Sequence, residues 1–458
     1  MLIVENKEWI DNNFGECQLG HTQRNERLRI VAQNMVERPD ESLPKQNSDW
    51  TDLRAAYNLF DRPEATLEYI ASVNWESSRA TKCKHVLLIC DTTDISHQNH
   101  KATTGLSMLG DGRGLGFQLH SCLMVNSQTK SIIGVAGAKF YHRRKAPEGE
   151  TRATRLARDR ESLLWGNVVD LVGRPPAEST WIHVFDRGGD NFEALCHIVL
   201  QECGWLIRVG QMSRKVLDEN GETIPINKVL KKAKFLGTYE LNLRARPGVA
   251  ARTAKISVSS ITIKLPRPSM TCQFIKDSGI KEIETNVLIV KEVDPPKGVT
   301  KICWVLMTSL AVDAFDQAWT VIEYYESRWL IEEYHKCLKS GCNIQGHSLR
   351  TSERLQAVSA VTSVIAVRLL SLKMDARNAP DTPARNRVPP LWLKALVALK
   401  PKLLKKALTV YGFFREVAKL GGFLGRKSDG EPGWQTVRCG MTRLMSIVQG
   451  MELAQKQR

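Results

Sequence analysis

One carboxylate in this chain is accompanied by two cations and a phenol at helical spacing. Tyr325, Arg328, Glu332 and Lys339 lie in a segment whose pattern predicts a helix. At about 100° per residue, an uninterrupted helix brings all four within roughly 60° of one another. A carboxylate beside a guanidinium, an ammonium and a phenol suits the handling of phosphate groups. A solvated helix face with mixed charges is the competing interpretation.

The choice of Glu332 over its acidic neighbours depends on the direction in which each side chain points around the helix. Glu326 and Glu333 point about 80–100° away from Glu332 in such a helix. We therefore predict that Glu332 is the acid committed to chemistry.

Two aspartates are predicted to follow buried strands. Asp91 ends the apolar run 85–91, and Asp186 ends the run 181–186, which a turn-forming segment follows. Carboxyl ends of strands are where open α/β sheets place their sites. The alternative is that each aspartate only caps a turn or the next helix.

Three acids in one place repel each other unless cations share them. With Glu332, the two aspartates Asp91 and Asp186 suggest a site for two hard divalent ions. Such ions polarise both the attacking and the leaving oxygen of a phosphodiester.

Composition favours a polyanionic partner. The 458 residues carry a formal charge of +16, with a pI near 9.4. We expect nucleic acid rather than a membrane, because no segment resembles a lipid-facing amphipathic helix and no run of about 18 apolar residues occurs. The scattered cysteines and the lack of a signal sequence favour a cytoplasmic protein, and the lack of a phosphate-binding glycine loop predicts no nucleotide cofactor.

The pattern of helices and strands predicts an α/β protein with three parts. Residues 1–70 form a small helical domain, and 71–375 alternate strands and helices with an antiparallel β insertion at about 205–312. Residues 376–458 form a basic helical region. Its last helix carries a stripe, typical of core or of a self-association face, at Met441, Leu444, Met445, Val448 and Met451.

Together these residues resemble the bacterial insertion-sequence transposases of the DDE class, in the group with a Tyr-x2-Arg-x3-Glu-x6-Lys signature that includes the transposon-five transposase. Tyr325, Arg328, Glu332 and Lys339 supply the complete signature. Further similarity lies in the acids' contexts and in Leu19–Gly20, Asp294–Gly298, Trp304 and Leu420–Phe423.

The resemblance implies an RNase H-like mixed-sheet catalytic core interrupted by the β insertion, an N-terminal domain that binds the transposon end, and a C-terminal region that pairs two protomers in a synaptic complex. Asp91, Asp186 and Glu332 would hold two Mg²⁺ ions, or Mn²⁺ in their place. The activity implied is cut-and-paste DNA transposition: metal-dependent cleavage at inverted-repeat ends, then transfer of the 3′ hydroxyl into target DNA.

The same resemblance implies several contacts with double-stranded DNA. Phosphate-binding roles fall to Tyr325, Arg328 and Lys339, and Trp304 would stack on a base flipped out at the transposon end. The remaining candidates, which would contact the DNA backbone or the transposon end, are Arg208, Arg24 and Arg27.

Two alternatives stay open. One is a domesticated or inhibitory DNA-binding protein without turnover. The other is a structure-selective nuclease on the same core, which cuts without joining. The intact acids and complete signature argue against loss of catalysis.

Overall fold

The computed structural model describes residues 4–39, 41–47, 49–99, 102–110, 112, 114–218, 220–245, 250–405, 407–426 and 428–456. The chain divides into two compact units. Unit 1 comprises residues 1–81, 92–144 and 330–458, and unit 2 comprises residues 82–91 and 145–329. Both units contain residues of the predicted catalytic domain, 71–375, so the three domain boundaries stay a prediction.

Unit 2 is built on a mixed sheet, as the sequence predicts. Its strand order is β1-β5-β6-β12-β11-β10-β7-β8, with β9 paired to β10. The strands are β1 (His85–Ser96, in this unit as far as Asp91), β5 (Thr180–Phe185), β6 (Gly204–Arg208), β7 (Lys215–Leu217), β8 (Thr223–Pro225), β9 (Lys234–Leu243), β10 (Arg252–Pro266), β11 (Glu282–Glu292) and β12 (Cys303–Thr308).

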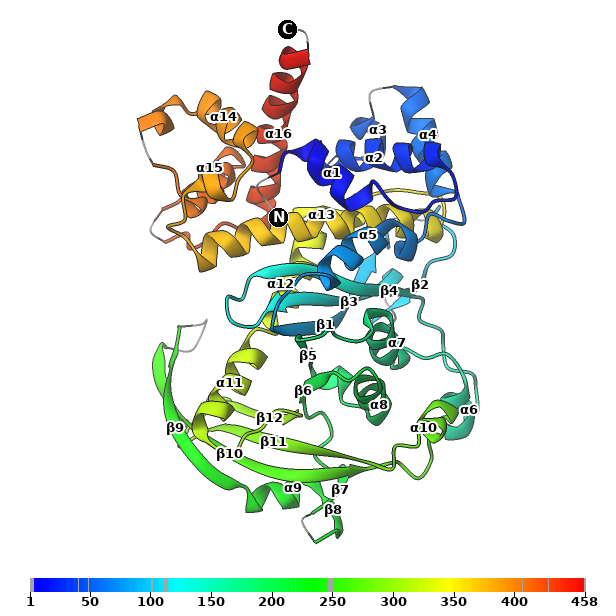
Figure 1. The fold of residues 1–458 in the computed structure, drawn as a ribbon, viewed down its shortest axis with the longest axis vertical. Coiled ribbons are helices and arrows are strands. Elements are labelled where there is room, and N and C mark those ends of the chain that lie inside the picture. The colour runs from blue at the N-terminus through cyan, green and yellow to red at the C-terminus, as the bar shows by residue number, and fades with distance from the viewer. Residues whose placement is uncertain are drawn as a thin grey trace. The chain divides into compact units, whose positions relative to one another are not determined.

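The parallel part of this sheet consists of β1, β5 and β6. Residues 86–90 of β1 are fully buried, as the continuous apolar run predicts for a strand covered on both faces. Helices α7 (Leu163–Val172) and α8 (Phe192–Leu200) lie beside one another next to these strands (Figure 1). They approach closely, because a side chain at Gly166 would collide with the His197 ring.

The antiparallel part of the sheet carries most of the predicted β insertion. Strands β6, β12, β11, β10 and β9 pair in antiparallel order. Because β6 also pairs in parallel with β5, the strand that opens the predicted insertion joins the two parts of the sheet. In β10 buried and exposed residues largely alternate, which is typical of a sheet with one covered face. Helix α11 (Phe315–Glu326) lies against this curved sheet (Figure 1), with Trp319 in edge-to-face contact with Tyr239.

Three shorter helices complete this description of unit 2. They lie in the loops that join its strands and carry few buried residues. Their bounds are α6 (Arg152–Ala157), α9 (Ile226–Val229) and α10 (Gln273–Asp277).

Unit 1 is mainly helical. Its strands β2 (Ser107–Leu109) and β4 (Ile132–Tyr141) both pair with β3 (Gly114–Asn126). Its helices are α1 (Asn6–Phe14), α2 (Thr22–Glu37), α3 (Leu43–Gln46), α4 (Trp50–Phe60), α5 (Leu67–Arg79), most of α12 (Trp329–Lys336), α13 (Ser352–Asn378), α14 (Pro390–Leu399), α15 (Val410–Leu420) and α16 (Trp434–Lys456). The predicted helical character of both chain ends is confirmed.

Helix α13 is the centre of unit 1. It contacts α5 and β4, and it is buried on nearly all sides. Among the described residues it is the one helix long and apolar enough to cross a membrane, but 94% of its apolar window is buried within the protein. The core helix of a globular protein has these same properties.

The apolar stripe of α16 is core rather than an open face. Met441, Leu444, Met445 and Val448 are each at most 2% exposed within a single chain. Of the two interpretations left open by the sequence, packing inside the chain therefore accounts for these four side chains.

Candidate active site

Asp91 lies within a strand rather than at its end. Strand β1 continues through Asp91 to Ser96, so the predicted strand end at Asp91 is wrong. The apolar run stops at Cys90, but the next residues include Thr92 and Thr93, whose β-branched side chains favour a strand. Burial becomes intermittent after Asp91, and the strand changes there from fully covered to partly exposed.

Asp186 directly follows β5, as predicted, and β5 pairs in parallel with the strand that carries Asp91. The two strands are parallel, and Ile89 pairs with Val184. Extended two residues beyond this last pair, the register would bring Asp91 level with Asp186, which follows the end of β5. Residues level on neighbouring parallel strands point to the same face, with backbones about 4.8 Å apart. By this extension both acids lie just past the carboxyl end of the stretch over which the two parallel strands pair.

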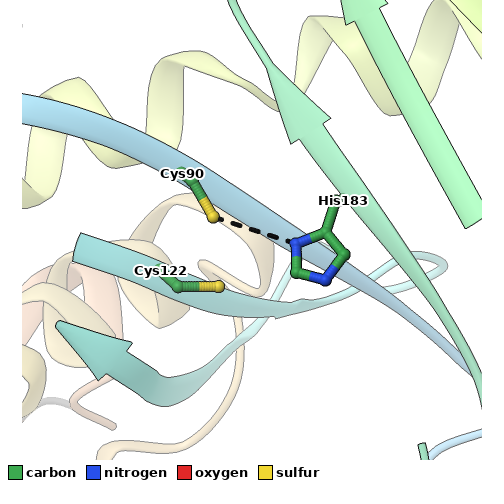
Figure 2. A group of neighbouring side chains, drawn as sticks. All are labelled: Cys90, Cys122 and His183. Carbon is green, nitrogen blue, oxygen red and sulfur yellow. Dashed lines mark hydrogen bonds between the residues drawn. The ribbon is translucent and has the colours of Figure 1, made fainter. Parts of the chain in front are cut away.

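The opposite face of these strands holds a buried thiol and imidazole. Cys90 Sγ lies 4.0 Å from His183 Nδ1, as Figure 2 shows. Burial lowers the pKa of His183 to about 3, so its imidazole is neutral. Because side chains alternate along a strand, Cys90 and His183 are separated from the carboxylate face. Cys122, also drawn in Figure 2, belongs to unit 1.

Asp186 also fulfils the capping role considered as the alternative. Its Oδ1 accepts a hydrogen bond of 2.7 Å from the Gly188 backbone N–H. The next acid, Asp190, is 6% exposed and is fully engaged with other groups. Its Oδ1 lies 2.5 Å from Arg214 Nη1, and its Oδ2 accepts a bond from the Gly210 N–H. Asp190 is therefore a structural acid, whereas Asp186 directly follows β5, where its Oδ1 caps the following turn.

A cation close to Asp91 is Arg328. Its Nη1 lies 3.8 Å from Asp91 Oδ2, and both side chains are about one-fifth exposed, at 21% and 22%. A guanidinium at this distance offsets part of the repulsion between two adjacent carboxylates.

The helix that carries the signature is interrupted, which corrects the predicted continuous stripe. Helix α11 ends at Glu326, where the Ser327 hydroxyl donates to the Glu323 carbonyl. A tight turn follows, with the Arg328 N–H donating to the Tyr325 carbonyl, before α12 begins at Trp329. The angular argument for one face of four residues therefore does not hold.

Tyr325 lies close to other predicted DNA-binding residues of unit 2. It is 4% exposed, and its ring makes an edge-to-face contact with Trp304, with centroids 5.3 Å apart. Burial raises the pKa of Tyr325, while the charges of Arg328 and Arg208 lower it and that of Asp186 raises it. Arg208, Arg328 and Asp186 are thus close enough to affect the charge state of this phenol.

The Tyr325 hydroxyl is poorly hydrogen-bonded among the described residues. Its buried Oη has no hydrogen bond of ordinary geometry among the described residues, although Arg208 is close enough to lower the pKa of Tyr325. Arg208 Nη2 donates to the Cys303 carbonyl over 3.3 Å, which ties β6 to the strand that carries Trp304. Trp304 is half-buried, so part of its ring faces solvent.

Glu332 and Lys339 belong to unit 1. Glu332 is exposed in the first turn of α12, whereas Glu333 is held by Lys373 Nζ and by the Trp434 indole N–H, each 2.6 Å from its Oε1. Glu333 is therefore a structural acid.

Lys339 lies on a π-helical turn, Cys337–Gly341, in which the Cys342 N–H donates to the Cys337 carbonyl. Such turns are frequent at functional sites. Burial lowers the pKa of Lys339, and the nearby carboxylate of Asp94 opposes that shift. Asp94 was not among the predicted site residues, because it lies beyond the apolar run that ends at Asp91.

The predicted end-binding arginines border a cavity of about 680 Å³ between α2 and α4. Arg24 Nη1 lies 3.0 Å from Glu64 Oε1, and Arg27 Nη1 lies 2.7 Å from Asp52 Oδ1. Both guanidiniums are thus held in place by acids at the edge of this cavity.

Two parts of the chain match known protein families. Residues 6–65, which include α2 and α4, match the family model described as transposase DNA-binding. Residues 364–457, which include α14 to α16, match the model described as the Transposase Tn5 dimerisation domain. Asp91, Asp186 and Glu332 all lie between the two matched regions.

The first match supports DNA as a partner of the N-terminal region. The second supports a second copy of the chain as a partner of the C-terminal region. The order of the matches, with DNA binding first and dimerisation last, is also the order expected from the sequence. A transposase DNA-binding region at one end and a Tn5-type dimerisation region at the other support a Tn5-like transposase.

Proposed function

We propose that this transposase catalyses cut-and-paste transposition at a DDE site formed by Asp91, Asp186 and Glu332. In this proposal it hydrolyses a phosphodiester at each inverted-repeat end and then joins the freed 3′ hydroxyl to target DNA. It acts in the bacterial cytoplasm, at the nucleoid, as a homodimer that holds two ends in a synaptic complex. The fold proposed for its catalytic part is RNase H-like.

The observation that supports the proposal is the parallel pairing of β1, which carries Asp91, with β5, which Asp186 directly follows. Two carboxylates on one face, with Arg328 Nη1 at 3.8 Å from one of them, form a strongly polar edge. A purely structural pair of adjacent acids would be unfavourable without a further cation to share it. The acids of a metal-dependent phosphoryl-transfer site have that arrangement.

The donor set fits two magnesium ions. The face that bears Asp91 and Asp186 offers carboxylate oxygens, and the thiol of Cys90 and the imidazole of His183 are on the other face. Oxygen donors of this kind suit Mg²⁺ or Mn²⁺ rather than a thiophilic ion. When bound, such ions supply charge stabilisation for the attacking and leaving oxygens.

The surrounding side chains would bind and orient the DNA end. Arg328 and Arg208 would each donate hydrogen bonds to phosphate oxygens, and the Tyr325 hydroxyl would donate a third. In this proposal the Lys339 ammonium also binds a phosphate of the DNA end. Trp304 would stack on a base extruded from the duplex, a contact worth roughly 1–3 kcal/mol. These roles are consistent with the Tyr325 hydroxyl lacking a hydrogen bond of ordinary geometry among the described residues.

The proposal is tested by separating binding from cleavage. Full-length Asp186→Asn protein is expected to bind an end duplex as tightly as the wild type, but to show no Mg²⁺-dependent cleavage. Asp316→Asn is the matched control, because Asp316 is an exposed acid at the start of α11 in the same unit. It is expected to cleave normally.

The readouts also separate the competing functions. Wild-type protein that binds ends but never cleaves them would favour the DNA-binding protein without turnover. Cleavage without joining of a pre-cut 3′ end to target DNA would favour the nuclease. Mg²⁺-dependent cleavage by the Asp186→Asn variant at the wild-type rate would contradict the assigned site.

A further inference from the structure

Unit 2 contains a second basic site, apart from the proposed phosphoryl-transfer residues. A cavity of about 310 Å³ lies among the segment that includes α6, the start of α8 and the loop before α10. Its cationic lining comes from three arginines, Arg152, Arg155 and Arg160. None of them was singled out from the sequence, because the segment contains acids as well as arginines and resembles a solvated helix.

The charges that line this cavity leave an excess of two positive charges. Arg160 is 7% exposed and is paired with Glu193, the one acid in the lining. Glu193 also accepts a hydrogen bond of 3.0 Å from the Cys272 thiol. Arg152 and Arg155 are exposed and form no ion pair among the described residues, although Glu150 lies near enough for Arg155 to lower its pKa. A fixed ion pair thus supports two cations that remain available to a ligand.

Neutral donors converge on the same cavity. The Asn191 Nδ2 and the Thr271 hydroxyl are buried atoms without a hydrogen-bond partner among the described residues. Asn191 caps α8 through its Oδ1, which accepts from the Ala194 N–H over 2.7 Å. The first backbone N–H groups of α8 therefore lie close by, at the positive end of a nine-residue helix. An anionic oxygen in this cavity would accept hydrogen bonds from these cationic and neutral donors.

We propose that this cavity binds a backbone phosphate of DNA, through Arg152 and Arg155 with help from Asn191 and Thr271. DNA is the source favoured by the transposase DNA-binding match and by the net charge of +16. The chain also continues from Asp186 to Asn191 through a single turn, so both the carboxylate and the cavity belong to the same edge of the sheet. The site would hold duplex beyond the cleaved bond without reading its sequence.

The inference does not depend on the three-carboxylate chemistry, because binding is measured without metal. The probe is a 30-base-pair duplex lacking any end sequence, bound to full-length protein in EDTA between about 50 and 200 mM salt. The slope of log Kd against log salt reports the number of phosphates contacted, at about 0.9 per contact. The double variant Arg152→Gln/Arg155→Gln is expected to reduce that slope by about 1.8.

Two controls distinguish a local site from bulk charge. The variant Lys228→Gln/Lys231→Gln removes the same charge from exposed positions of unit 2 outside the cavity, and it is expected to keep the wild-type slope. The variant Arg152→Lys/Arg155→Lys, which retains the charges, is expected to recover most of the wild-type slope. An unchanged slope in the glutamine variant, or an equal loss in the Lys228/Lys231 variant, would overturn the proposal.

A third arm separates DNA from a small anion. Inorganic phosphate at 10 mM is tested for its effect on the melting temperature of the wild type and of the glutamine variant. A stabilisation that requires Arg152 and Arg155, combined with an unchanged DNA slope, would assign the cavity to a free anion and would also overturn the proposal.

Discussion

At Tyr325 the ring and the hydroxyl have separable roles. The ring packs against Trp304, whereas the buried hydroxyl lacks an ordinary partner among the described residues. Burial raises the pKa of this phenol above its usual value, so it remains protonated and can donate at neutral pH.

Tyr325→Phe should therefore leave stability nearly unchanged and slow end cleavage. A hydrogen bond to a charged phosphate contributes about 1.5–3 kcal/mol, which corresponds to roughly 10- to 100-fold in rate. Single-turnover cleavage and thermal melting are the two measurements. A variant that loses several degrees in melting temperature at full cleavage rate would show that the hydroxyl is structural.

Glu332 and Glu333 allow a paired test of adjacent acids. Glu332→Gln should abolish cleavage with little change in the free energy of unfolding. Glu333→Gln should instead lower that free energy by about 1–3 kcal/mol, because it weakens the contacts with Lys373 and Trp434. Chemical denaturation and cleavage of each variant should show opposite patterns, and identical patterns would contradict the assignment.

The stabilising effect of Glu333 should depend on pH. Burial opposes its ionisation, but the hydrogen bond and charge of Lys373 outweigh that effect, so the pKa of Glu333 lies below its usual 4.5. An acid with a depressed pKa stabilises the fold above its unfolded-state pKa and loses that effect as pH falls through the folded value. The difference between wild type and Glu333→Gln should thus be full near pH 7 and shrink below about pH 4.5.

At the scale of elements, the contact between α7 and α8 fixes the helix that follows Asp186. A side chain at Gly166 would collide with the His197 ring, which also stacks on Phe274 at 3.9 Å. Alanine normally stabilises a helix relative to glycine by up to about 1 kcal/mol. Here Gly166→Ala should destabilise by about 1–3 kcal/mol through overpacking.

Gly433→Ala is the control for that substitution, because nothing lies within 4 Å of a side chain added there. Its melting temperature should match the wild type. Equal melting temperatures for Gly166→Ala and Gly433→Ala would mean that α7 and α8 are less tightly packed than the structure has them.

The elements also show which features local sequence can specify. Helix α4 (Trp50–Phe60) lies in the predicted helical region 1–70 and ends before Pro63, since proline and apolar spacing act locally. The break after Glu326 was missed because no proline or glycine marks it in the local sequence. The pairing of the strand that carries Asp91 with the strand that Asp186 follows could not be predicted either, because the register joins strands far apart in the chain.

At the scale of the whole molecule, Arg368 links the DNA-binding and dimerisation matches within unit 1. It is 2% exposed, and its guanidinium lies 4.9 Å and 4.7 Å from the ring centroids of Trp9 and Trp392. It donates to Asn6 Oδ1 over 3.0 Å and to the Val4 carbonyl over 3.1 Å. One side chain on α13 thus holds α1 and α14.

Arg368→Leu should lower the free energy of unfolding by about 2–4 kcal/mol, because two acceptors lose their donor and the space between the indoles is no longer filled. Arg368→Lys should be only partly tolerated, since a lysine lacks the planar group that stacks on both rings. Chemical denaturation is the measurement. Lys394→Leu, at an exposed position of α14, should have little effect; an equal loss there would refute a special role for Arg368.

The central claim is that Asp91, Asp186 and Glu332 share bound metal, and metal-directed cleavage of the polypeptide tests it most directly. Fe²⁺ replaces Mg²⁺ in full-length protein bound to an end duplex, and ascorbate with peroxide then generates radicals at the bound ions. We predict backbone cuts near residues 91, 186 and 332, suppressed by excess Mg²⁺ and lost in the Asp186→Asn variant. Cuts near only one or two of these positions, or a pattern unchanged by Mg²⁺, would contradict the account.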